Sequence, residues 1–228
     1  MIRPRDRAGP LLSLSPGRGT GIAVLEDQLK ETALSKLVEF VAPYADMDRA
    51  RLREMVDHIP VKLYPKGTAL IHQGEEVTRC FFILEGCARK YSVDESGNEV
   101  TSDFITENQA VVVFGPDIAE SPYSFTCLED SLMIVGDLAE EQSEYDRYPE
   151  FADITRRMIE DNMGTLQSEF TDFIRLSPED RVKRMMDRRP ELFDRVPQHQ
   201  LASFLGITPE SLSRIKRRLV HGDLKLVD

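Results

Sequence analysis

The residues best suited to a specific chemical task lie close together near the C-terminus, where Glu210, Ser211 and Arg214 follow one another at helical spacing. An Arg guanidinium can donate two parallel hydrogen bonds to guanine, and a Glu carboxylate can accept one from the cytosine amino group. The neighbouring lysine and arginines are suited to phosphate contacts. We therefore predict a helix that reads base edges. The full predicted DNA-contacting set is Gln198, Thr208, Glu210, Ser211, Arg214, Lys216, Arg217 and Arg218.

The residues around this set predict how the helix is positioned. Gly206 stands just past a first helix, where a left-handed conformation is needed, and Thr208 and Pro209 suit the cap and first turn of a second helix. The residues expected to pack between the two helices are Leu201, Ala202, Leu205, Ile207, Leu212, Ile215 and Leu219. This spacing favours a helix-turn-helix over the alternative, an ordinary helical hairpin with a solvated basic face.

The charge distribution agrees with a nucleic-acid partner for one end of the chain only. The 228 residues carry a net charge of −11. From residue 175 to 228, however, 12 Lys and Arg face 8 Asp and Glu, whereas the remainder has 17 basic and 32 acidic residues. A weakly basic C-terminal quarter on an acidic body is typical of a DNA-binding module joined to a part with another task.

The middle of the chain has the pattern of an antiparallel β-domain. Two helices are predicted first, over residues 25–41 and 47–56. Short apolar runs then alternate with turn residues such as Lys66-Gly67 and Glu85-Gly86, a pattern typical of a sandwich or barrel. The predicted strands cover residues 61–64, 69–71, 80–84, 88–93, 100–105, 110–114 and 131–135.

A long helix is predicted after Pro149. Its apolar residues step by three or four and include Phe151, Ile154, Met158, Leu166, Phe170 and Phe173. About 26 helical residues span roughly 39 Å, and so long and narrow a stripe favours a seam between two helices. The alternative is a helix that packs on its own domain. Ser177 and Pro178 then begin a further helix that runs to about residue 187.

Composition sets the remaining boundaries. Residues 1–24 are rich in Arg, Pro and Gly, which predicts a disordered tail, and no run of 18 apolar residues exists. The predicted division is a tail at 1–24, a β-domain at 25–149, a long helix at 150–176 and a helix-turn-helix domain at 177–228, in a cytoplasmic protein. Cys80, Cys87 and Cys127 lack metal-ligand spacing, so they are expected as buried small side chains, with no metal site and no cofactor.

From about residue 25 to 227 the order of these elements resembles the Crp/Fnr family of transcriptional regulators. The pattern Leu201 to Ile215 carries the resemblance most specifically, and the turns Lys66-Gly67, Gln73-Gly74-Glu75 and Asp94-Glu95-Ser96-Gly97 support it. The family implies an α+β fold: an N-terminal antiparallel β-roll (a double-stranded β-helix) as sensor, a long dimerisation helix and a C-terminal winged helix-turn-helix.

The resemblance also implies a function and partners. By it, Glu210 and Arg214 correspond to base-reading positions, and Pro209 stands where some members carry an arginine, so the target sequence should differ from theirs. It implies no catalytic activity, a homodimer on a pseudo-palindromic site whose halves lie one helical turn apart, and RNA polymerase as a partner.

The sensor half departs from the family members that bind cyclic nucleotides. Those members place a Gly-Glu pair and an Arg-Ser or Arg-Thr pair in the stretch that corresponds here to residues 109–125. No Lys or Arg occurs between Lys90 and Arg147. A buried phosphate without a cationic partner is unfavourable, so cyclic AMP binding is not expected. The predicted effector pocket, for a small apolar or uncharged ligand or for none, consists of Phe104, Val113, Phe114, Tyr123 and Ser124.

Other sensors and functions remain open. An iron–sulfur cluster needs four cysteine ligands and the chain has three, while His58 and His72 are the candidate axial ligands for haem. A cupin-like metalloenzyme would need clustered ligands, and the β-domain offers only His72 after Pro60. A third alternative is an interaction module whose helix-turn-helix binds protein. Salt-dependent binding to duplex DNA would discriminate the regulator from both.

Overall fold

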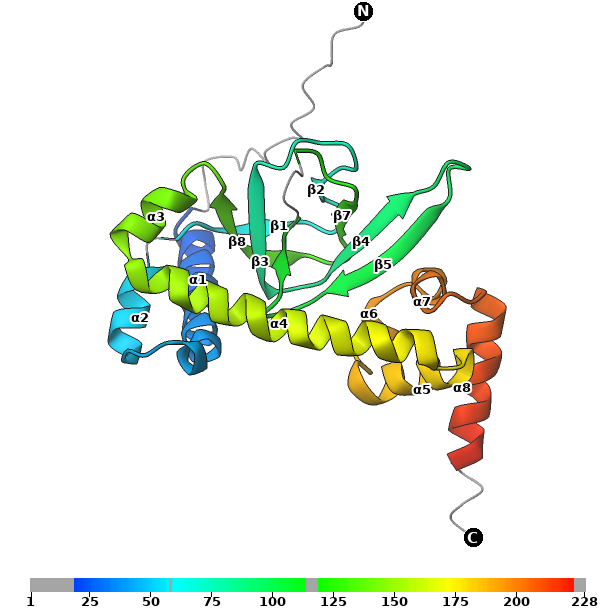
Figure 1. The fold of residues 1–228 in the computed structure, drawn as a ribbon. Coiled ribbons are helices and arrows are strands. Elements are labelled where there is room, and N and C mark those ends of the chain that lie inside the picture. The colour runs from blue at the N-terminus through cyan, green and yellow to red at the C-terminus, as the bar shows by residue number, and fades with distance from the viewer. Residues whose placement is uncertain (1–18, 58, 114–118, 224–228) are drawn as a thin grey trace, which may run out of the picture.

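The computed structural model describes residues 19–57, 59–113 and 119–223. Figure 1 shows a β-domain covered on one side by helices, a long helix α4 that runs beneath it, and a group of short helices at the far end of α4. No helix in these three ranges combines the length and the apolar character needed to span a membrane. The architecture is therefore mixed helix and strand, as predicted.

The first helix begins earlier than expected, and the second begins two residues later. Helix α1 covers Gly19–Val41, the 3-10 helix η1 covers Ala42–Tyr44 and α2 covers Arg49–Val56. Residues 19–24, which were assigned to a disordered tail, therefore belong to a helix, and residues 1–18 of that tail lie outside the described chain. Helix α2 has a local cap, because the Asp48 carboxylate accepts a 2.9 Å hydrogen bond from the Arg51 backbone N–H.

The β-domain consists of two four-stranded antiparallel sheets. The strands are β1 Val61–Tyr64, β2 Ala69–Ile71, β3 Arg79–Glu85, β4 Ala88–Val93, β5 Glu99–Ile105, β6 Ala110–Val111, β7 Ser124–Cys127 and β8 Ser131–Asp137. One sheet has the order β1-β8-β3-β6 and the other β2-β7-β4-β5. In the part of the chain that the structure describes, the two sheets do not close into a barrel. Successive strands switch from one sheet to the other, as in a roll, except for the hairpin β4–β5, whose strands lie in the same sheet. This pattern confirms the predicted antiparallel β-roll.

Two strands differ from their prediction. Strand β6 ends at Val111, so the run predicted over 110–114 is shorter, and β7 was missed. Strand β7 has only four residues, but it lies between β2 and β4 in its sheet and buries Phe125 and Cys127 in the roll core. The Ser-Pro pair just before it resembles a loop, which hides a strand whose place is set by partners far along the chain.

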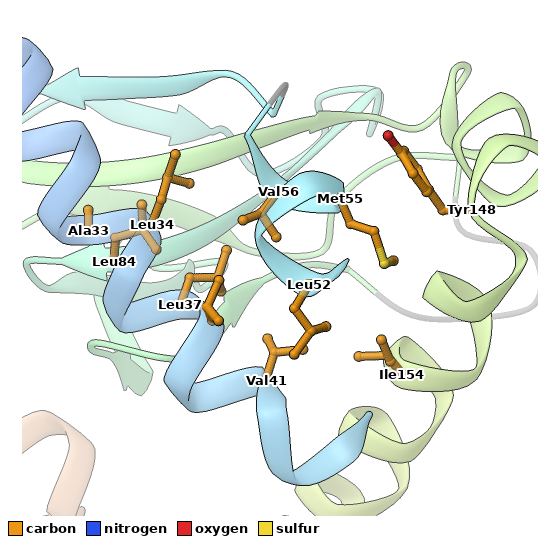
Figure 2. Packing of buried hydrophobic residues seen from close by; sticks show 11 residues of the cluster. Ala33, Leu34, Leu37, Val41, Leu52, Met55, Val56, Leu84, Tyr148 and Ile154 are labelled. Carbon is orange, nitrogen blue, oxygen red and sulfur yellow. The ribbon is translucent and has the colours of Figure 1, made fainter. Parts of the chain in front are cut away.

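A helical layer closes one side of the roll. Leu37 and Val41 of α1 and Leu52 of α2 point toward Ile154 of α4 (Figure 2). Helix α3 (Glu141–Arg147) leads into α4 (Pro149–Arg175). Only the first turns of α4 pack here, through Phe151, Ile154 and Met158. The single long stripe predicted for this helix is therefore divided, and its first part packs on its own domain.

The C-terminal part is helical throughout its described residues. It contains α5 Pro178–Arg188, α6 Leu192–Arg195, α7 Gln198–Leu205 and α8 Pro209–Asp223. Ser177 caps α5 as predicted, since its hydroxyl accepts from the Asp180 N–H at 3.2 Å. The wing implied by the family resemblance is not found in residues 177–223, and residues 224–228 lie outside the description.

Candidate nucleic-acid interface

The turn between α7 and α8 has the local geometry that the sequence predicts. Gly206 adopts φ 68° and ψ 34°, the left-handed conformation that glycine tolerates best. The Thr208 hydroxyl caps α8 by accepting from the Ser211 N–H at 3.2 Å. The Ile207 N–H donates to the Ala202 carbonyl at 3.0 Å, which closes the turn. These bonds set the direction in which α8 leaves the turn.

The inner faces of the two helices are buried as expected. Leu201, Ala202 and Leu205 of α7 pack with Leu212 and Ile215 of α8 in one apolar cluster. Ala202 is completely buried, so a larger side chain would collide with its neighbours there. The helix pair is thus a rigid unit, and its opposite face presents polar side chains to solvent.

The side chain of Gln198, predicted to contact DNA, makes hydrogen bonds within the protein. Its side-chain amide donates to the Pro209 carbonyl at 3.1 Å and to the Ser213 hydroxyl at 2.6 Å. Gln198 therefore ties the start of α7 to the first turns of α8. Sequence reasoning missed this positioning role, because the two bonds join residues 11 and 15 positions apart.

The exposed face of α8 carries the predicted base-reading residues. Glu210 and Arg214 are exposed, and Ser211 is half-buried between them. Arg214 donates from Nη2 to the Ser211 hydroxyl at 3.1 Å. The backbone N–H at the helix start, followed by the Thr208 hydroxyl, lowers the pKa of Glu210. The face therefore presents an ionised carboxylate beside an oriented guanidinium.

The remaining basic residues of α8 are not equivalent. The Lys216 Nζ lies 4.7 Å from the centroid of the Phe193 ring, a cation–π contact that holds it against α6. Arg218 donates to Glu179 of α5 at 2.7 Å. Arg217 is exposed. For Lys216 and Arg218, DNA would therefore have to share or displace these protein contacts.

The second part of α4 presents an exposed apolar surface, on which the Arg181 guanidinium lies 4.1 Å from the Phe173 ring centroid. It carries the exposed residues Met163, Leu166, Phe170, Phe173 and Ile174, which we call the α4 stripe. Met163, Leu166, Phe170 and Phe173 recur with the alternating three- and four-residue spacing of a two-helix seam. In the described chain nothing packs over Met163 or Phe170, whose exposures are 64% and 67%.

The predicted effector pocket is divided by the structure. Phe104 is fully buried, but its ring lies 5.5 Å from that of Phe204, among side chains of the C-terminal helices rather than inside the roll. Alternation along β5 turns its side chain outward, and periodicity alone does not say which face of a strand is inside. Val113 and Tyr123 do pack against the roll core.

The other two pocket residues give less support. The Ser124 hydroxyl is buried and accepts from the Gln73 N–H at 2.9 Å, so it is satisfied by the protein itself. Phe114 lies outside the described residues. The five predicted residues therefore do not form one cluster, and membership of a common pocket remains a prediction for Val113 and Tyr123 only.

Lys90 is a roll residue that sequence reasoning overlooked. Its Nζ lies 4.0 Å from the Tyr123 ring centroid and 6.0 Å from that of Phe125. Burial lowers the pKa of Lys90, opposed by the nearby Asp103 carboxylate. Strand alternation could have predicted this position. Lys90 is two residues from the core residue Ala88 on β4, so both side chains lie on the inner face of the strand.

The three cysteines are free thiols rather than disulfide partners. Cys87 and Cys127 are buried, as expected, and burial raises the pKa of the Cys87 thiol to about 12 and that of Cys127 to about 11. Cys80 is half-buried. Over the described ranges, His, Cys, Asp and Glu do not gather into a group of three or more that could hold a metal ion.

Comparison with known proteins agrees with this architecture. Residues 61–140, which contain the strands of the β-roll, match the family described as the cyclic nucleotide-binding domain. The match covers the strands β1 to β8 and leaves the C-terminal helices to be compared by structure. A search of curated protein sequences finds no match to the chain.

Solved structures extend the likeness beyond the roll. FixK2 from Bradyrhizobium japonicum is similar with a TM-score of 0.57 at 14% identity, over 72% of this chain and 86% of its own. The c-di-GMP responsive global regulator CLP from Xanthomonas campestris has a TM-score of 0.57 at 14% identity, over 78% and 94%. A putative cAMP-binding regulatory protein from Silicibacter pomeroyi has a TM-score of 0.55 at 19% identity, over 83% and 88%.

Proposed function

We propose that this chain is a sequence-specific DNA-binding transcriptional regulator of the Crp/Fnr type, without catalytic activity. The match of its roll to the cyclic nucleotide-binding domain and its likeness in fold to solved regulators support this proposal. The observation that carries this proposal is the α7–α8 unit. Its turn is closed by Gly206 and capped by Thr208, and its exposed face holds Glu210 and Arg214. RNA polymerase is the partner through which such a regulator would act, in the cytoplasm.

In this proposal α8 lies in the major groove and α7 crosses the backbone. Arg214 pairs with a guanine and Glu210 accepts from a cytosine amino group. Lys216, Arg217 and Arg218 contact phosphates, which share or replace the contacts that these side chains make within the protein. Phosphate contacts set the register of the protein on the duplex, whereas the two base contacts define its sequence.

We propose a homodimer formed through the α4 stripe. Two copies of the stripe would bury apolar side chains such as Phe170 that are otherwise exposed to water. A twofold axis along this seam would present one α8 from each subunit to the same face of a duplex, and hence to two half-sites.

For the sensor, we propose that the roll does not bind cyclic AMP. No Lys or Arg occurs in residues 91–146, and a buried phosphate without a cationic partner is unfavourable. Lys90 lies on the inner face of the roll, but its ammonium group already makes a cation–π contact with the Tyr123 ring. Calorimetric titration of the full chain with cyclic AMP should give no binding, and tight binding would overturn this part.

The DNA proposal is tested by titrating the protein into random-sequence duplex DNA at increasing salt. We expect affinity to fall steeply between about 50 and 200 mM salt, because each neutralised phosphate releases counterions. Binding that is absent at low salt, or that does not depend on salt, would contradict the proposal. It would instead favour a helix-turn-helix that binds protein.

A further inference from the structure

One guanidinium of the C-terminal helices binds two separate turns of the roll. Arg195, the last residue of α6, donates two hydrogen bonds to Glu107, at 2.7 and 3.0 Å. It also donates from Nε to Glu129 at 3.1 Å. Glu107 lies in the turn between β5 and β6, and Glu129 in the turn between β7 and β8. Two separate turns of the roll thus hold a single side chain, in a group that we call the Arg195 latch.

The charged side chains of the latch are partly shielded from solvent. The side chain of Arg195 is only 21% exposed, and those of Glu107 and Glu129 are 39% and 33% exposed. Burial acts to raise the pKa of Glu107, but hydrogen bonds from Arg195 and from the Gly86 N–H hold it below the ordinary 4.5. The carboxylate is therefore ionised at neutral pH, and bidentate pairs of this kind fix geometry as well as distance.

Neighbouring contacts continue the same joint. Arg189 donates to the Phe104 carbonyl at 2.6 Å, and the Thr101 N–H donates to the Ser203 hydroxyl of α7 at 3.0 Å. The Phe104 and Phe204 rings pack beside them, and Cys87 is buried in the same cluster. Figure 1 shows the β4–β5 hairpin passing close to α6 and α7, with its tip directed away from them. The roll therefore contacts α7 through Ser203 and Phe204.

The C-terminal helices have a second attachment, to the end of α4. Arg184 pairs with Asp172, and Arg181 donates to the Phe173 carbonyl at 3.1 Å and to the Leu205 carbonyl at 3.2 Å. Between α4 and α5 only Leu176 and Ser177 are extended. The C-terminal helices are thus connected to α4 by a short linker at residues 176–177. Away from that linker, the Arg195 latch holds them against the roll.

These contacts leave the DNA-reading face free. Glu210 and Arg214 are exposed, whereas the α7 residues that meet the roll are Ser203 and Phe204. The latch does not cover the reading surface. What it determines is the direction in which that surface points, relative to the roll and to α4.

We propose that Arg195, held by Glu107 and Glu129, is a determinant of half-site spacing in the DNA target. This inference rests on the proposed function, a dimer joined through α4. In such a dimer the separation of the two α8 helices depends on how each helix-turn-helix is held relative to α4. With the latch closed, one separation is favoured, and it selects one spacing of the half-sites. Without it, the unit turns about residues 176–177 and accepts several spacings.

The test is a selection on a DNA library in which two inverted random half-sites are separated by spacers of varied length. It uses the full chain, Arg195→Gln and, as a second route to the same loss, the double variant Glu107→Gln/Glu129→Gln. We expect both variants to select the wild-type half-site sequence. Their preference for the favoured spacer over its neighbours should fall by about tenfold, the size expected for one charge-assisted contact.

The matched control is Arg49→Gln. Arg49 also makes a bidentate pair with a carboxylate, Glu39, at 2.6 and 2.9 Å, but between residues near α1 and α2. Arg49→Gln removes one positive charge but leaves the contacts between the roll and the C-terminal helices unchanged. The spacer preference of this variant should therefore equal that of the wild type. Combining Arg195→Gln with the double variant should add no further loss, because all three side chains act through one contact.

A second readout does not involve DNA. Cys87 is buried between the roll and the C-terminal helices, whereas Cys127 is buried in the roll core. Alkylation mapped by peptide mass spectrometry should become at least several-fold faster at Cys87 in both latch variants, and stay unchanged at Cys127. This contrast separates an opened joint from a roll that is unfolding.

The outcomes are distinct. If the wild type enriches no half-site, the proposed function fails and the spacing role fails with it. If the wild type selects half-sites at one spacing and both latch variants keep that spacing, only the spacing role is overturned. If Arg195→Gln does not fold, the double variant decides in the same way, because it retains the arginine and the packing around it.

Discussion

Gln198 and Ser213 are joined by a 2.6 Å hydrogen bond between the side-chain amide of the first helix and the hydroxyl of the second. With the 3.1 Å bond from the same amide to the Pro209 carbonyl, it fixes the start of α7 against the first turns of α8. In the proposed complex with DNA, the angle between these helices would determine whether Glu210 and Arg214 reach the bases together.

Gln198→Ala should therefore weaken DNA binding without changing the sequence that is preferred. Loss of the two neutral bonds corresponds to about 1 kcal/mol, or roughly fivefold in affinity. Fluorescence anisotropy with a selected duplex and with point-mutated duplexes measures both quantities. His199→Ala, at the next exposed position, should leave affinity unchanged. A change in the preferred bases would show that Gln198 reads DNA directly.

Arg214→Ala should both weaken binding and relax specificity at one base pair. The expected loss is about 1–3 kcal/mol on the selected site, because a bidentate contact to guanine is removed. It should be much smaller on a site with that base pair changed. Arg188→Ala, an exposed arginine of α5, serves as a control for lost charge. Equal losses on both sites would mean that Arg214 contacts only the backbone.

Phe170→Glu should convert the protein to a monomer at micromolar concentration. A charge in the centre of the α4 stripe would lie in an apolar seam without a partner, which is strongly unfavourable. Sedimentation velocity measures the change. Leu63→Glu is the control, since Leu63 is also an exposed apolar residue, at 64%, but lies on β1. A dimer that survives Phe170→Glu would place the seam elsewhere.

Lys90→Met should raise the free energy of unfolding at neutral pH, by about 1 kcal/mol. Burial lowers the pKa of Lys90 below its ordinary 10.5, so the unfolded chain binds this proton more tightly than the folded one. The resulting penalty is fully present below the folded pKa. It is relieved as pH rises from there to 10.5.

Denaturant unfolding of both proteins between pH 7 and 11 checks this sign. The advantage of Lys90→Met over the wild type should shrink toward alkaline pH. Lys62→Met, at an exposed lysine of β1, is the control for the loss of a lysine outside the roll core. An advantage that grows with pH, or a destabilised variant, would mean that the contact with the Tyr123 ring outweighs the burial of the charge.

Features fixed by neighbours in the sequence were the ones that could be predicted. The left-handed Gly206, the Thr208 cap and the Ser177 cap each depend on residues within a few positions. Most strands of the roll were predicted for the same reason, since turn glycines and alternation are local signals.

Features set by distant partners were missed or misplaced. Phe104 was placed inside the roll, although its partner Phe204 lies 100 residues further along the chain. The stripe on α4 was read as one seam, although Ile154 packs on α1 and α2. The Arg195 latch joins residues 66 and 88 positions apart, and no local pattern marks such a pairing.

The central claim is that α7 and α8 read a defined DNA sequence from a symmetric dimer. Selection of bound duplexes from a fully random pool tests it most directly. We predict enrichment of an inverted repeat whose half-site centres lie about one helical turn, roughly 34–36 Å, apart, and loss of that enrichment with Arg214→Ala. Recovery of no common sequence from the wild-type protein after repeated rounds would contradict the account.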